Sequence, residues 1–182
     1  MQRLASLEME NARLRQLLDS TARIGSRALV AEILAVDLDP YRQRFDLNRG
    51  RVDGVYVGQA LIDAQGVVGQ VVRVGPYSSE AVLITDADHA VPVSVNRNGL
   101  RTIAVGTGDS GKLRLPYLTN NADIAVGDLL ISSGLGGVFP AGYPVGRVLE
   151  ITRRPDQAFA EIVAEPASAL DRDREVLLVW DD

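Results

Sequence analysis

Two residues of this 182-residue chain could support hydrolysis, the single histidine His89 and the serine of Gly108-Asp109-Ser110-Gly111. A serine hydrolase needs its serine hydroxyl beside an imidazole that a buried carboxylate orients. However, strand-like residues flank Gly108–Gly111 on both sides, so the segment is first of all typical of a hairpin turn. We therefore keep a two-barrel serine hydrolase using Ser110 and His89 as the alternative hypothesis.

The sequence offers little to a metal or a cofactor. There are no cysteines and only one histidine, which excludes thiolate sites and multi-histidine zinc sites. The acidic pairs Asp37/Asp39, Asp86/Asp88 and Asp171/Asp173 are typical of turns and form no complete calcium loop. The glycine-rich segment 134–142 is followed by prolines and a strand, whereas a phosphate cradle needs a helix there. We expect no cofactor and no metal.

That glycine-rich segment is a candidate interaction site instead. It is a long connection between strands, and it places apolar side chains in an expected surface loop. The predicted partner or self-association loop consists of Gly134, Leu135, Gly136, Gly137, Phe139 and Pro140.

Residues 1–24 have the pattern of a dimerising coiled coil. Apolar residues and one asparagine recur with alternating spacings of three and four, the a/d rhythm of a heptad: Leu4, Leu7, Asn11, Leu14 and Leu18. Charges of opposite sign flank this stripe, and an amide at an a position favours a dimer in one register. A helix packed on its own domain is the alternative. We predict a homodimer.

From residue 25 onward, short β-branched runs alternate with turn residues, which indicates barrels or sandwiches. Strands are expected at Ala28–Val36, Ala60–Ile62, Val67–Val74, Ala81–Thr85, Val91–Val95, Arg101–Val105, Lys112–Leu115, Leu129–Ser132, Val145–Thr152, Phe159–Val163 and Glu175–Trp180.

A short internal repeat suggests two related subdomains. Residues 58–62 and 68–71 resemble residues 127–131 and 145–148. The predicted fold class is mainly β, with two small six-stranded β-barrel-like subdomains preceded by the N-terminal coiled-coil helix. Subdomain I would be discontinuous, residues 25–57 and 124–182, and subdomain II would span residues 58–123.

Charge and hydropathy limit the partners. A formal net charge of −5 argues against nucleic-acid binding, which depends on clustered basic residues. No apolar run reaches the length of about 20 residues that spans a bilayer. The scarcity of catalytic residues in a sheet-rich domain behind a dimerising helix favours a binding module over an enzyme.

The β region also resembles a known family. The segments Asp53-Gly54-Val55, Gly66-Val67-Val68-Gly69-Gln70-Val71, Gly127–Pro140 and Tyr143-Pro144-Val145-Gly146-Arg147-Val148 follow a heptad helix in the order typical of the rod shape-determining protein MreC family. Gly127-Asp128 together with Ser133–Pro140 is the most specific part.

The resemblance implies a non-catalytic periplasmic scaffold of the cell-elongation machinery, which organises lateral peptidoglycan synthesis and maintains rod shape. It implies an inner-membrane anchor upstream of this sequence, and a homodimer that can assemble further. Its implied partners are the elongation-specific penicillin-binding protein, RodA, MreD and the MreB system.

Overall fold

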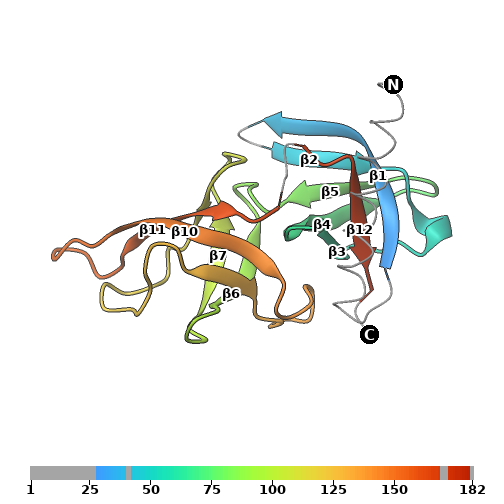
Figure 1. The fold of residues 1–182 in the computed structure, drawn as a ribbon. Helices are drawn as coiled ribbons and strands as arrows, with labels where there is room; N and C mark the ends of the chain where they lie inside the picture. Colours follow the sequence, from blue (N-terminus) through green and yellow to red (C-terminus); the bar gives the residue numbers. More distant parts are fainter. Residues whose placement is uncertain (1–27, 40–41, 169–171, 181–182) are drawn as a thin grey trace, which may run out of the picture.

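A computed structural model describes residues 28–39, 42–168 and 172–180 (Figure 1). Within these residues the chain forms strands and a single-turn 3-10 helix, η1 (Arg51–Asp53). The strands are β1 (Ala28–Asp39), β2 (Arg42–Leu47), β3 (Ala60–Ile62), β4 (Val67–Val74), β5 (Ser79–Leu83), β6 (Ala90–Val95), β7 (Arg101–Gly106), β8 (Leu113–Arg114), β9 (Leu129–Ser132), β10 (Pro144–Thr152), β11 (Glu161–Pro166) and β12 (Glu175–Val179).

The strands close into two antiparallel six-stranded barrels, which confirms the mainly β class. Barrel I has the strand order β1-β12-β3-β4-β5-β2, and barrel II has the order β10-β11-β8-β7-β6-β9. Figure 1 shows the barrels side by side, joined by the chain between β5 and β6 and by its return from β11 to β12. The predicted coiled-coil residues, Leu4 to Leu18, lie outside the described residues.

The predicted boundaries of the subdomains were wrong. Residues 58–83 belong with residues 28–57, because β5 pairs with β2 and β3 pairs with β12. Residues 129–166 belong to barrel II, because β9 pairs with β6 and β11 pairs with β8. The prediction placed a boundary at or just before the start of each copy of the repeat. In the structure each copy is a hairpin within a barrel, and neither copy is the beginning of a barrel. Barrel I is nonetheless discontinuous, because β12 returns to complete it.

The internal repeat is structural and lies at β3–β4 in barrel I and at β9–β10 in barrel II. Leu61 is opposite Gly69 in the first hairpin, as Leu130 is opposite Gly146 in the second. An added Cβ would lie 1.9 Å from the Val82 carbonyl oxygen at Gly69, and 2.5 Å from a backbone oxygen at Gly146. Both positions therefore require glycine, because a third strand passes too close for a side chain.

Strand β2 was missed by the sequence analysis. It alternates buried and more exposed residues, as a barrel strand must, but one of its inward residues is Gln43. A polar inward residue breaks the apolar alternation that marks a strand in sequence. The side-chain amide of Gln43 forms hydrogen bonds with segments distant in sequence, described below.

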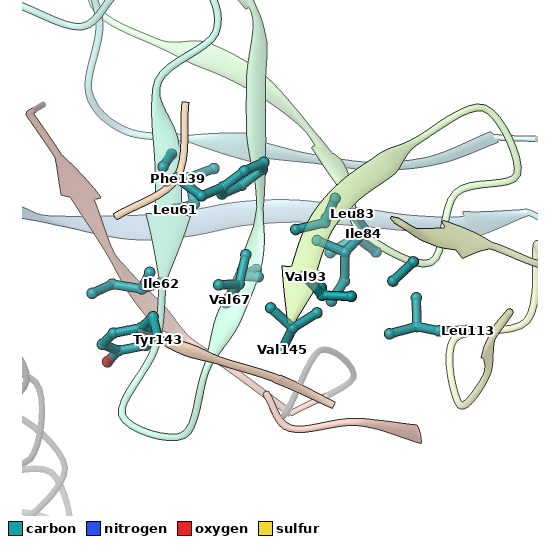
Figure 2. Close-up of a cluster of buried hydrophobic side chains, with 14 of the residues drawn as sticks. Leu61, Ile62, Val67, Leu83, Ile84, Val93, Leu113, Phe139, Tyr143 and Val145 are labelled. Carbon is teal, nitrogen blue, oxygen red and sulfur yellow. The ribbon is translucent and has the colours of Figure 1, made fainter. Parts of the chain in front are cut away.

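The buried residues of both barrels form one continuous apolar cluster built mostly from Val, Leu, Ile and Ala. Phe139 and Tyr143, from the β9–β10 connection of barrel II, extend this cluster toward Leu61 and Ile62 of barrel I (Figure 2). The two barrels consequently share a core at their junction.

Candidate functional site

A network of polar side chains joins the barrels beside this shared core. The Gln43 side chain of β2 donates to the Gly108 carbonyl of barrel II at 2.6 Å and accepts a bond from the Thr85 hydroxyl. The Asp86 carboxylate, in the segment between the barrels, accepts from the backbone N–H of Gln43 at 2.8 Å and from that of Asp88 at 2.9 Å. Because buried polar groups are costly unless paired, these bonds specify one arrangement of the barrels.

His89 lies at the junction, in contact with Gln70 of barrel I and Phe139 of barrel II, and is only 7% exposed. Its Nε2 lies 3.0 Å from Oε1 of Gln70 on β4. Its ring meets Phe139 edge to face, with centroids 6.0 Å apart. Burial lowers the pKa of His89 to about 4, more than the nearby Asp86 carboxylate raises it. The imidazole is therefore neutral at pH 7 and serves as a packing group.

The β9–β10 connection docks barrel II on barrel I. The hydroxyl of Ser132 donates to the Pro140 carbonyl and accepts from the Tyr143 amide at 2.9 Å, which closes the loop. The Tyr143 hydroxyl then donates to the Asp63 carbonyl of barrel I at 2.8 Å. The loop thus links barrel II to barrel I through this hydrogen bond.

The structure divides the predicted partner loop into a buried part and an exposed part. Phe139 is 6% exposed and packs in the junction, so its side chain is not presented to a partner. Leu135 is 50% exposed, and Gly136 and Gly137 beside it are also exposed. Gly134 and Pro140 are half-buried. The partner-loop prediction is thereby narrowed to the tip around Leu135.

The alternative hydrolase site is not assembled. Ser110 lies in the turn between β7 and β8, where Asp109 accepts from the Gly111 amide at 2.9 Å. His89 Nε2 is engaged with Gln70, and its buried Nδ1 has no hydrogen-bond partner. Among the described residues, Ser110 and His89 share no hydrogen bond, so the structure does not pair them as a nucleophile and its base.

Gly127-Asp128, part of the segment that carries the resemblance, has a structural role. Asp128 accepts two hydrogen bonds from Arg97, both at 3.0 Å, and caps the Ala125 amide at 2.8 Å. The hydrogen bond from Arg97 lowers the pKa of the Asp128 carboxyl. This pair ties the β6–β7 turn to the loop before β9.

On the outer face of barrel I, three arginines surround one carboxylate. Glu80 of β5 contacts Arg42 at 2.9 Å, Arg44 at 3.7 Å, and Arg73. Burial by itself raises the pKa of Glu80, but the hydrogen bond from Arg42 and the three positive charges outweigh it and lower that pKa. The cluster links β2, β5 and β4.

The described residues offer neither a metal site nor a membrane-spanning helix. No group of three or more His, Cys, Asp or Glu residues could hold a metal there. Nor does that part of the chain contain a helix with the length and hydropathy to cross a bilayer.

Sequence reasoning missed Gln43, Asp86 and Tyr143 as junction residues. Each makes its decisive contact with a residue at least 43 positions away in the sequence. The sequence feature that could have indicated the junction is the polar residue Gln43 at an inward position of β2. Its burial is explained by the hydrogen bond to the Gly108 carbonyl of barrel II.

Solved structures share this fold. A structure named MreC superposes with a TM-score of 0.91 at 50% identity, covering 96% of this chain and 99% of that one. A complex between penicillin-binding protein PBP2 and MreC from Helicobacter pylori contains a chain with a TM-score of 0.66 at 19% identity, covering 86% of this chain and 100% of that one. A major periplasmic domain of the cell shape-determining filament MreC gives 0.68 at 24% identity, covering 85% and 97%. At 19% and 24% identity, the last two likenesses show a common fold.

Curated relatives are similar over nearly the whole chain. The cell shape-determining protein MreC of Haemophilus influenzae is 46% identical over 177 residues, which cover 97% of this chain and 50% of the relative. The protein of the same name from Escherichia coli is 45% identical, covering 97% and 48%. The chain thus spans about half the length of the curated relatives it matches.

A family model described as "Rod shape-determining protein MreC, barrel core" matches residues 33–180. That range contains all of barrel II and all of barrel I except the start of β1. The chain therefore belongs to the MreC family of rod shape-determining proteins.

Proposed function

We propose that the chain is a non-catalytic scaffold of the bacterial cell-elongation machinery, which organises lateral peptidoglycan synthesis by binding other proteins. The observation that carries this proposal is the junction between the barrels. Its buried polar side chains, Gln43, Asp86 and His89, are all engaged in holding two β-barrels in one arrangement. A scaffold needs barrels that are held rigidly, because it can position its partners relative to one another only if its own docking surfaces are fixed.

The proposed partners are the elongation-specific penicillin-binding protein, RodA, MreD and, across the membrane, the MreB system. The complex of PBP2 with MreC from Helicobacter pylori supports the first of these. The proposed location is the periplasm, with an inner-membrane anchor in the full-length protein. The periplasmic domain among the structural neighbours supports that location.

We also propose that residues 1–24 pair in a homodimer. The heptad stripe from Leu4 to Leu18 supports this, and pairing would place two copies of each barrel side by side, so that modest contacts gain avidity. Replacing Asn11 and Leu14 by lysine should convert a dimer into a monomer in sedimentation, with an unchanged β-sheet circular dichroism spectrum. A wild-type chain that is monomeric at high concentration would contradict the dimer.

The partner proposal is tested by photocrosslinking at the tip of the β9–β10 loop. A photoreactive amino acid at Leu135 in the full-length protein should capture the penicillin-binding protein or a second copy in growing cells. The same amino acid at Ala141, an exposed position of the same loop, shows whether capture depends on the tip. Capture of neither protein from Leu135, in cells that keep their rod shape, would remove the loop tip as a docking site.

A further inference from the structure

The second half of β1 has a strand edge that no other described strand covers. β1 pairs with β12 over Ala28–Glu32 and with β2 over Ile33–Asp39, on opposite edges. Among the described residues, no strand continues beside residues 34–39 on the edge where β12 ends. All six of these residues are exposed, and in Figure 1 the blue end of β1 projects from barrel I with β2 along one side.

Such an edge can accept another strand. Residues along an antiparallel pair alternate between hydrogen-bonding to their neighbour and directing their N–H and C=O outward. Every second residue of 34–39 therefore directs its backbone groups to the uncovered edge, where the Asp39 N–H already donates to the Asp37 carboxylate at 3.1 Å. Peptides that add a strand to an exposed sheet edge use these groups for affinity and the alternating side chains for specificity.

The two faces of this edge differ in chemistry. Val36 and Leu38 lie opposite Phe45 and Gln43, on the inward face, yet they are 48% and 38% exposed. Asp37 lies opposite Arg44, and the next acidic residue, Asp39, lies opposite Arg42 on the same outward face.

Both arginines also contact Glu80, so the carboxylates of β1 share the positive charge of β2 with a third acid. A strand added at the edge would meet aliphatic groups on one face and carboxylates on the other.

This pattern selects the occupant. Opposite charges directly across two strands are favourable and like charges are unfavourable. A second copy pairing through the same edge would bring Asp37 and Asp39 of both copies onto one face. The bulge between Ile33 and Ala35 is another feature by which exposed edges avoid pairing with themselves.

We propose that residues 34–39 of β1 form a docking edge for an extended segment of a partner protein, in which aliphatic residues alternate with lysine or arginine. The aliphatic residues pack beside Val36 and Leu38, and the basic residues pair with Asp37 and Asp39. The docked segment becomes a strand next to β1. This inference rests on the proposed scaffold function, for which it supplies one docking surface.

The test titrates the chain with two capped, fluorescently labelled seven-residue peptides, one alternating valine with lysine and the other alternating valine with glutamate. The lysine peptide should bind about tenfold more tightly than the glutamate peptide, from two cross-strand charge pairs. The double variant Asp37→Lys/Asp39→Lys should reverse that preference. In amide NMR spectra, the lysine peptide should shift the resonances of residues 34–39.

A matched variant, Glu150→Lys/Asp156→Lys, changes two exposed carboxylates of barrel II and so has the same net charge. It should keep the wild-type preference. Equal binding of both peptides, an equal loss in the barrel II variant, or amide shifts elsewhere would overturn the proposal. So would a dimer of the chain that dissociates on Val36→Lys, because the edge would then belong to a second copy.

Different results would refute the docking edge and the scaffold function. If Asp37→Lys/Asp39→Lys reverses the peptide preference but full-length protein carrying it still crosslinks to the penicillin-binding protein, the edge is one surface among several of the scaffold. If the wild-type chain binds the lysine peptide but captures no cell-wall protein in cells, the edge stands and the proposed function fails. If the wild-type chain binds neither peptide, the inference about the edge is wrong.

Discussion

Truncating Phe139 tests whether the junction couples the barrels. Its ring is 6% exposed and meets His89 edge to face. Replacing a buried phenylalanine by alanine costs about 3 to 5 kcal/mol, from lost burial and from the cavity that remains. We expect Phe139→Ala to cost about 4 kcal/mol, because the edge-to-face contact is lost as well.

The assay is urea unfolding followed by the fluorescence of Trp180, the only tryptophan of the chain, which follows β12 of barrel I. With a urea dependence of about 2 kcal/mol per molar, the midpoint should fall by about 2 M. Because Phe139 belongs to barrel II and the probe to barrel I, a shift of this size reports coupling between them.

The matched control is Phe159→Ala, the same change at a barrel II side chain that is 50% exposed. It should cost no more than about 1 kcal/mol, as surface changes do. An unchanged Trp180 transition in Phe139→Ala would mean that barrel I unfolds independently of barrel II. An equal shift in Phe159→Ala would mean that the effect does not arise at the junction. Either result refutes the reasoning about the junction.

Two further results are expected of the purified chain. The pKa of His89 is about 4 in the folded chain, against an ordinary value of 6.5. Between these two pH values the imidazole is protonated in the unfolded chain and neutral in the folded chain. The contribution of His89 to stability should therefore fall by about 3 kcal/mol from pH 7 to pH 4. The urea midpoint of His89→Gln should lack that part of the pH dependence, and an unchanged pH dependence would contradict a buried neutral imidazole. Gly69→Ala should cost about 3 kcal/mol by chemical denaturation, because its Cβ would collide with the Val82 carbonyl, whereas Gly111→Ala in the β7–β8 turn should cost less than about 0.5 kcal/mol; similar values for both would show that the strands separate to admit a side chain.

The elements that local pattern controls were predictable from the sequence. Ala60–Ile62, Val67–Val74 and Leu129–Ser132 were expected at the bounds the structure shows, because apolar alternation between turn residues is a local property. The turn containing Ser110 was also expected, from the strands that flank it.

The junction was not predictable, because its side chains are satisfied only by the other barrel. Gln43 looks like a surface residue until Thr85 and Gly108 lie against it, and this hid β2. Phe139 in a glycine-rich loop looked exposed, although barrel I covers it. The division into barrels failed for the same reason, since it depends on which strands close the sheet and not on where a repeat begins.

If this chain works by holding other proteins, it must bind one of them directly. Isothermal titration of the folded chain with the purified extracytoplasmic part of the elongation-specific penicillin-binding protein should give saturable binding at one site per chain. Phe139→Ala should weaken that binding, because the barrels are no longer held in one arrangement. A titration at protein concentrations of about a hundred micromolar also detects complexes weaker than most specific ones. No heat of binding at these concentrations would contradict a scaffold that binds this partner.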